Sequence, residues 1–305
     1  MASVAQIREE YQKKRWADAV GPGSAQVRRN WRRALEDQIA ALKRENDDLN
    51  RAIFEAAQAQ RRLCGPRYFR AGAYEFASEI FPVRHLSGDF ISVIRFEGDI
   101  IFAIGDIAGK GLLAGMWFTH MVGIIRREVC AHGDPAAALS AVDRNLLVSG
   151  VEFPMTTLFL ARLNPATGDL TYCNAGHPPA LLIRDNGELE ELQQGGPVLG
   201  AISGGKFING RTKLSAGSTL LAYSDGIAEC RNESGVEFGS QRLKGQLRAY
   251  ASSSPSAMLF SVLAGVETFA GSRHREDDIA LMILRRSRDC EVYAPERNGL
   301  ERHAA

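Results

Sequence analysis

Four aspartate residues stand beside glycine, or at the start or end of apolar runs, and are the first candidates for chemistry. They are Asp89, Asp106, Asp225 and Asp277. A carboxylate at the tip of a buried strand must be hydrogen-bonded, paired or metal-bound. Four such groups converging from separate strands would form an all-oxygen cluster suited to Mg²⁺ or Mn²⁺. Any one of them taken alone is typical of an ordinary turn, so the prediction depends on the four together.

Three other polar residues near these positions invite a catalytic interpretation. Arg84, five residues before Asp89, is a secondary candidate for binding a substrate phosphate bidentately, with a solvated surface arginine as the equal alternative. His177 lies in a tight turn and is predicted to be structural. Lys110 stands between two glycines, but the spacing G-x-x-x-x-G-K-[ST] is absent, so the sequence predicts no nucleotide site.

The elements that must position these residues are short strands and a few helices. Alternating residues predict strands over 89–96, 100–104, 157–163 and 170–173, joined by Gly- and Asn-containing turns, with a further hairpin at Asn186-Gly187. Helices are expected over 112–130, 134–148, 240–250 and 255–270, and a last strand over 279–285. Hairpins with grouped helices favour antiparallel sheets and an α+β fold over alternating β-α-β units.

Five segments taken in order resemble one protein family. They are Phe81–Phe90, Gly105–Gly111, Asn174–Pro179, Tyr223–Glu229 and Asp277–Ile279. Together they are similar to the SpoIIE/RsbU branch of the metal-dependent protein phosphatases (the PPM family), relatives of protein phosphatase 2C. The resemblance runs from about Tyr68 to Arg286. Ser87 stands where the family usually has glycine and Ala108 where it usually has serine or another small residue, but no metal-binding acid is lost.

The resemblance implies a four-layer α-β-β-α sandwich of two antiparallel sheets with a metal site at one edge. The family's metal ligands fall on Asp89, Asp106, Ile107, Asp225 and Asp277. Asp106 would bridge two ions, helped by the backbone carbonyl of Ile107; Asp89 would serve one ion and the last two aspartates the other. Asp277 is preferred to Asp278 because the first acid of the pair aligns with the family's ligand. Two or more Mn²⁺ or Mg²⁺ ions would activate a water that attacks phosphorus in line.

The N-terminal 68 residues are predicted to be helical, with a break at Gly21–Gly23 before a candidate N-cap, Ser24. Heptad positions carry mostly apolar residues over about four repeats, with a single asparagine and a glutamine at a positions. They are Leu35, Ile39, Leu42, Asn46, Leu49, Ile53, Ala56, Gln60 and Leu63. Leucine at d with isoleucine and one asparagine at a favours a parallel two-stranded coil. The alternative is an amphipathic helix lying on its own domain.

Composition sets the remaining limits. The chain has 305 residues, 45% hydrophobic and 24% charged, with 37 Lys and Arg against 36 Asp and Glu. That balance favours neither nucleic acid nor an anionic membrane as partner. Five scattered cysteines favour a reducing cytoplasm, and the most apolar stretch, 111–125, is shorter than the ~20 residues that span a bilayer. We expect a dimerisation segment over 1–68, a phosphatase domain over 69–286 and a flexible tail over 287–305.

The predicted function is a metal-dependent serine/threonine protein phosphatase. The resemblance implies a phosphorylated anti-sigma-factor antagonist as substrate, in a bacterial partner-switching pathway. Two alternatives stay open at this point: a non-catalytic phosphoprotein-binding scaffold of the same fold, and a small-molecule phosphohydrolase that uses the same metal site. The residues name neither the substrate protein nor the upstream signal nor the physiological metal.

Overall fold

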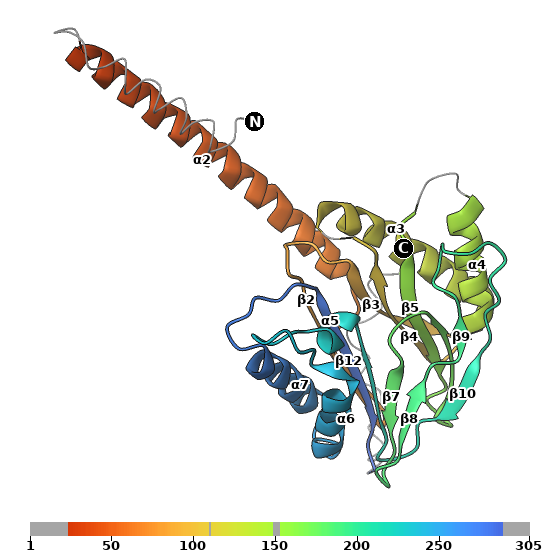
Figure 1. Ribbon diagram of the computed structural model, residues 1–305. Coiled ribbons are helices and arrows are strands. Elements are labelled where there is room, and N and C mark those ends of the chain that lie inside the picture. The colour runs from red at the N-terminus through yellow and green to blue at the C-terminus, as the bar shows by residue number, and fades with distance from the viewer. Residues whose placement is uncertain (1–23, 110, 149–152, 289–305) are drawn as a thin grey trace. The chain divides into compact units, whose positions relative to one another are not determined.

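A computed structural model describes residues 24–109, 111–148 and 153–288. Contacts group the chain into two compact units, Met1–Phe54 and Glu55–Ala305. The second unit holds two six-stranded sheets (Figure 1). The last turns of the long N-terminal helix belong to this second unit, ahead of the first strand at Tyr68. Residues 289–305 of the expected tail lie outside the described residues.

The first sheet joins segments from both ends of the second unit. Its strand order is β1-β2-β12-β11-β7-β8, and all neighbours are antiparallel. The strands are β1 (Tyr68–Ala71), β2 (Tyr74–Phe81), β12 (Ile279–Arg286), β11 (Thr219–Tyr223), β7 (Ala180–Ile183) and β8 (Leu189–Leu192). Because β2 pairs with β12 along its whole length, the loop after β2 lies beside the segment that leads into β12.

The second sheet is built from hairpins, as predicted. Its order is β10-β6-β5-β4-β3, with strands β10 (Gly210–Lys213), β6 (Asp169–Ala175), β5 (Thr156–Leu163), β4 (Asp99–Ile107) and β3 (Asp89–Phe96). The predicted turn between β3 and β4 has positive φ at Glu97 (50°) and Gly98 (88°). One pairing departs from the expected antiparallel pattern: the two-residue β9 (Gly195–Gly196) runs parallel to β6.

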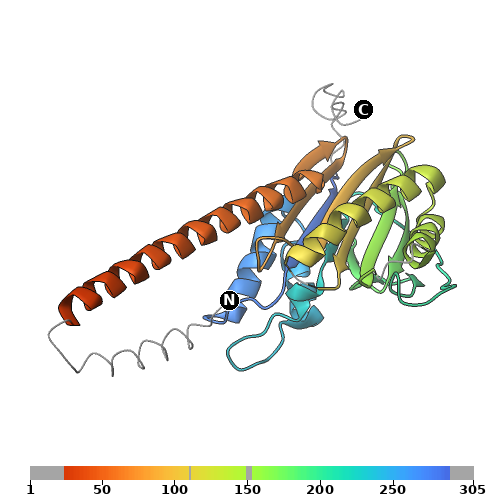
Figure 2. The ribbon, with the colours of Figure 1, turned by 90° about the horizontal axis from the view of Figure 1, so that it is seen from above.

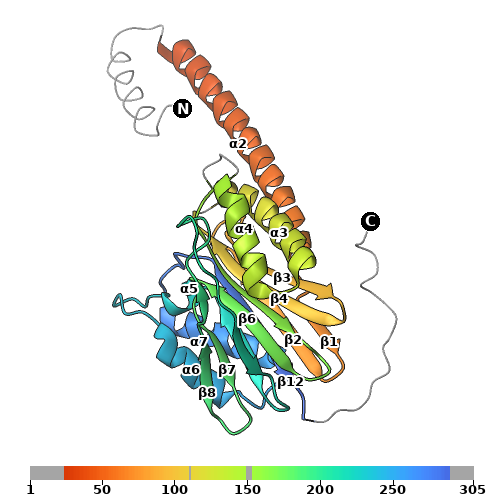
Figure 3. The ribbon, with the colours of Figure 1, turned by 90° about the vertical axis from the view of Figure 1, so that its right-hand side faces the viewer.

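Three apolar cores separate four layers. Strand β4 shows the alternation: Phe102 and Ile104 pack between the two sheets, whereas Ile101 and Ala103 pack toward the helices. Those helices are α3 (Leu112–His132) and α4 (Pro135–Val148); on the outer face of the other sheet lie α6 (Gly239–Ala249) and α7 (Pro255–Ala270). Figures 2 and 3 show the two helix pairs on opposite sides of the sheets. The predicted α-β-β-α sandwich is confirmed.

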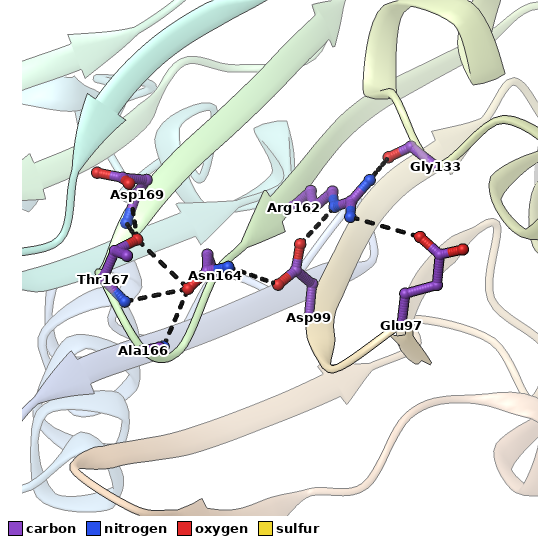
Figure 4. Close-up of polar contacts among 8 residues, drawn as sticks. All are labelled: Glu97, Asp99, Gly133, Arg162, Asn164, Ala166, Thr167 and Asp169. Carbon is purple, nitrogen blue, oxygen red and sulfur yellow. Dashed lines mark hydrogen bonds and ion pairs between the residues drawn. The ribbon is translucent and has the colours of Figure 1, made fainter.

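A polar network fixes the hairpin turns at the ends of β3, β4 and β5 that lie opposite Asp89 (Figure 4). Arg162 Nε lies 2.6 Å from Asp99 Oδ2, and its Nη1 donates to the carbonyl of Gly133 at 3.1 Å. Asn164 Nδ2 donates to the other oxygen of Asp99 at 3.0 Å. These bonds link the β3–β4 turn, the β5–β6 turn and the end of α3. Asp89 and Asp106 lie at the opposite ends of β3 and β4.

The N-terminal helix α2 spans Ser24–Leu63 and begins at the residue predicted to cap it. Ile39, Leu42 and Leu49, three of the predicted heptad residues, are 44%, 54% and 53% exposed within the single chain. The helix is therefore confirmed, while its pairing with a second copy stays a prediction. Across the described residues, we find no helix with the length and apolarity needed to cross a membrane.

Candidate active site

Asp89 and Asp106 face each other across two neighbouring strands. Asp89 opens β3, Asp106 lies one residue before the end of β4, and the two are register partners in the antiparallel pair. Asp89 is 1% exposed and Asp106 is half-buried. The predicted pair of carboxylates thus shares one end of the second sheet.

Asp225 and Asp277 come from the other sheet. Asp225 follows β11 and begins α5 (Asp225–Ala228), a single turn of helix, and Asp277 lies two residues before β12. Because β11 and β12 are antiparallel neighbours, the end of one strand meets the start of the other. A Cβ added to Gly226 would lie 1.9 Å from the carbonyl oxygen of Asp278 and 3.4 Å from Asp277 Cβ. Only glycine allows the two acidic segments to approach so closely.

Ser224 connects the two halves of the site. Its hydroxyl donates to Asp89 Oδ2 at 2.7 Å, and its Oγ accepts the backbone N–H of Ala280 at 2.8 Å. The side chain is fully buried. One residue of the first sheet therefore holds the carboxylate that opens the second sheet. Ser224 was not among the predicted site residues; its place directly before Asp225 was the available signal.

Asp278 fixes the loop that precedes Asp89. Its Oδ1 accepts the N–H of Val83 at 2.7 Å, and its Oδ2 accepts the hydroxyl of Ser87 at 2.8 Å and the N–H of Gly88 at 2.9 Å. The side chain is 8% exposed. Asp278 is thus committed to backbone and hydroxyl donors, whereas the half-buried Asp277 accepts the N–H of Asp278 at 3.0 Å.

Gly88 allows the backbone carbonyl oxygen of Ile107 to lie close to the loop before Asp89. A Cβ at this position would lie 2.7 Å from the carbonyl oxygen of Ile107 and 3.1 Å from Asp106 Oδ1. The contact with the carbonyl oxygen is closer than real Cβ atoms come, so this close approach favours glycine. The Ile107 carbonyl, the predicted backbone ligand, consequently lies beside the Asp106 carboxylate.

The electrostatics of the site follow from burial and like charge. Burial raises the pKa of Asp89 well above its usual range, and the neighbouring carboxylate of Asp106 raises it further; Asp278 and Asp225 add smaller effects of the same sign. The Ser224 hydroxyl opposes these effects. The pKa of Glu229 is also raised, by burial and then by Asp225. Concentrated negative charge of this kind favours a bound cation.

The donor set fits hard divalent cations, because it offers carboxylate and carbonyl oxygens alone. Within the described ranges, no three His, Cys, Asp or Glu side chains are already arranged to hold a metal ion. Repulsion among carboxylates works against such an arrangement, and Asp89 Oδ2 accepts the Ser224 hydroxyl. The structure brings the predicted acids to one end of the two sheets.

Positive side chains border the acidic residues. Arg84 is exposed, and its Nη1 lies 3.5 Å from the position of a Cβ on Gly111, in the loop that follows β4. A cavity of about 180 Å³ beside Asp277 has a lining of mixed charge, with Arg231, Arg273, His274 and Arg275 beside Glu229 and Glu276. Lys110 lies outside the described residues. An anionic substrate would meet guanidinium groups next to the acids.

His177 lies at the interface of the two sheets, in the structural role expected for it. Its Nδ1 is 2.9 Å from Thr157 Oγ1, and the side chain is 4% exposed. Burial lowers the pKa of His177 to about 3, so the ring is neutral at physiological pH. The Asn174 amide braces the same turn through the backbone N–H and carbonyl of His177.

Comparison with known proteins agrees with this geometry. The family model of Stage II sporulation protein E (SpoIIE) matches residues 97–287. Phosphoserine phosphatase RsbU of Bacillus subtilis is 27% identical over 238 residues, which cover 76% of this chain and 69% of RsbU. Protein IcfG of Synechocystis is 28% identical over 55% of this chain, but the match spans only 31% of IcfG.

Solved structures show the same fold. The SiaA PP2C domain of Pseudomonas aeruginosa superposes with a TM-score of 0.69 at 20% identity, covering 79% of this chain and 98% of that domain. The PP2C phosphatase domain of SpoIIE from Bacillus subtilis, crystallised with a fragment of its regulatory domain, gives a TM-score of 0.62 at 19% identity, covering 72% and 64%. The chain therefore belongs to the SpoIIE/RsbU-type family of PP2C-like phosphatases.

Proposed function

We propose that this chain is a Mn²⁺- or Mg²⁺-dependent phosphatase that removes phosphate from phosphoserine or phosphothreonine in a protein. The observation that carries the proposal is the buried Asp89 carboxylate, opposite Asp106 and hydrogen-bonded from the other sheet by Ser224. This arrangement is costly without a cation and well suited to one.

The proposed ligands are those named from the sequence. Asp106 and the carbonyl of Ile107 would hold two ions between them, Asp89 would serve one, and Asp225 with Asp277 the other. The commitment of Asp278 to the Val83–Gly88 loop supports the choice of Asp277 as ligand. Bound divalent ions supply a water of lowered pKa and neutralise charge on phosphoryl oxygens.

The chain's own residues would orient the substrate. Arg84 offers a planar guanidinium beside the loop that follows Asp106, a geometry that suits two phosphoryl oxygens. The cavity next to Asp277, with arginines and glutamates in its lining, would receive polar residues that neighbour the phosphorylated one. Buried Ser224 and Asp278 would hold Asp89 and its loop in place while substrate enters.

The names of the relatives support the substrate class. RsbU and RsbP of Bacillus subtilis are both described as phosphoserine phosphatases, and one structural neighbour joins RsbU and RsbW domains in a protein of Mycobacterium tuberculosis. A further neighbour is RsbX in complex with magnesium. We propose a phosphorylated anti-sigma-factor antagonist as substrate, within a partner-switching pathway.

A panel of substrates tests the proposal against its alternatives. Full-length protein with Mn²⁺ is given a phosphoserine-bearing antagonist protein, sugar phosphates and nucleotides, and released phosphate is measured. We expect the phosphoprotein to give the highest kcat/KM. Higher kcat/KM on a sugar phosphate or nucleotide would indicate a small-molecule phosphohydrolase. Binding of the phosphoprotein without phosphate release would indicate a scaffold.

A further inference from the structure

Gln60, in the last turn of α2, contacts the loop that precedes Asp89. Gln60 Nε2 donates to the carbonyl of Ser87 at 2.8 Å, and the N–H of Ser87 donates to Gln60 Oε1 at 3.1 Å. The Gln60 side chain is 8% exposed. Its carboxamide therefore makes the two hydrogen bonds to Ser87 that a neighbouring antiparallel strand would make.

Ser87 passes this contact on to the acidic residues. Its hydroxyl donates to Asp278 Oδ2 at 2.8 Å and accepts the N–H of Asp89 at 3.1 Å. The next residue, Gly88, accepts the N–H of Ile107 at 3.3 Å through its carbonyl. The loop is thus held by Gln60 of α2 on one side and by Asp278 on the other. The positions of two proposed ligands, Asp89 and the Ile107 carbonyl, depend on the conformation of this loop.

The contact between Gln60 and Ser87 involves a residue of the predicted coiled coil. Gln60 occupies an a position of the heptad pattern, where it would face its copy in a parallel dimer. In the structure both polar atoms of its amide are used within its own chain. A buried amide needs such partners wherever it occurs, but here the partner is two residues from a proposed metal ligand.

We propose that Gln60 is a positioning residue of the active site: by fixing the backbone of Ser87, it sets Gly88, Asp89 and the Ile107 carbonyl for metal binding. The inference rests on the proposed metal-dependent function. It assigns the end of α2 to the catalytic machinery, independently of whether α2 also pairs with a second chain.

Replacement of the amide in the full-length chain tests the proposal. Gln60→Leu keeps the size of the side chain and removes both hydrogen bonds; Gln58→Leu, at an exposed position of the same helix, is the matched control. We expect Gln60→Leu to weaken Mn²⁺ binding about tenfold, as loss of an outer-shell partner does elsewhere. Gln58→Leu should bind Mn²⁺ with the wild-type affinity. Binding is read directly by calorimetric titration, not only from activity.

A second variant separates positioning from loss of folding. The protonated carboxyl of Gln60→Glu can donate to Ser87 and accept from it as the amide does, whereas the carboxylate cannot donate. The ratio of its Mn²⁺ dissociation constant to the wild-type value at the same pH should therefore approach one as pH falls. A ratio independent of pH, or unchanged Mn²⁺ binding in Gln60→Leu, contradicts this proposal alone. A wild-type protein that binds no Mn²⁺ contradicts the proposed function as well.

Discussion

Asp89 receives one hydroxyl hydrogen bond, from Ser224, and faces the carboxylate of Asp106 from a position that is 1% exposed. Its raised pKa means that a proton and a metal ion compete for the same carboxylate. Replacing a neighbouring acid therefore has opposite effects on metal-free stability and on metal binding.

Asp106→Asn tests this balance. The amide removes one of the like charges that surround Asp89, so the melting temperature without metal should equal or exceed that of wild type. Turnover should fall at least about 100-fold, because the proposed bridging ligand is lost and outer partners alone cost 10–100-fold. Calorimetry in EDTA and phosphate release with Mn²⁺ measure the two effects. Asp37→Asn, at an exposed position on α2, should change neither; wild-type turnover in Asp106→Asn would show that Asp106 is not a ligand.

His177 gives a prediction for stability against pH. Its pKa is about 6.5 in the unfolded chain and about 3 in the folded one. Between these values the unfolded chain binds a proton that the folded chain does not. The stabilisation from neutral His177 is thus complete above pH 6.5 and is lost as pH falls toward 3, by up to about 1.4 kcal/mol per pH unit.

Urea unfolding in EDTA at a series of pH values measures this slope. His177→Gln removes the titrating ring, so the difference in free energy of unfolding between wild type and variant should shrink as pH falls below 6.5. Two profiles that stay parallel from pH 7.5 downward would mean that His177 titrates normally in the folded protein.

At the scale of the elements, most of the longer segments were predicted closely, but no strand was predicted over 74–81, which is β2. The strand expected over 89–96 is β3, and the helix expected over 112–130 is α3, which continues to His132. The alternating apolar pattern is strong in the first segment, and the helical apolar pattern is strong in the second. The one-turn α5 and the two-residue β9 were missed, because such short elements carry no periodic pattern and are set by contacts with β12 and β6.

Helix α2 carries the prediction that belongs to this scale. Its exposed apolar residues, including Ile39, should pair two chains in a parallel coil within 35–63, ahead of Gln60, whose amide bonds Ser87 of its own chain. Ile39→Asp with Ile53→Asp would bury charges in the seam and should yield monomers. Arg44→Asp with Arg51→Asp, at outward heptad positions, is the control and should remain dimeric. Sedimentation measures the molecular mass of each protein in solution. A wild-type chain that is monomeric at micromolar concentration would contradict the predicted coiled coil.

At the scale of the whole molecule, the site exists because two sheets end at the same place. Ser224 and Asp89 are 135 residues apart in the chain and 2.7 Å apart in space. The individual Asp-Gly positions were visible in the sequence, and the order of five motifs indicated the family. The bracing by Ser224, Asp278 and Gln60 was not predictable, because it depends on how β3, β11, β12 and α2 approach one another rather than on any local pattern.

The most direct test of the central claim is a Mn²⁺ titration of phosphate release. Full-length protein is stripped with EDTA, dialysed and assayed on an aryl phosphate and on a phosphoserine-bearing antagonist protein while Mn²⁺ is added back. Carboxylate-held ions that keep several waters are removable by a chelator, so activity on both substrates should vanish in EDTA and return with Mn²⁺. Undiminished phosphate release in excess EDTA would contradict the assignment of the four aspartates to a catalytic metal site.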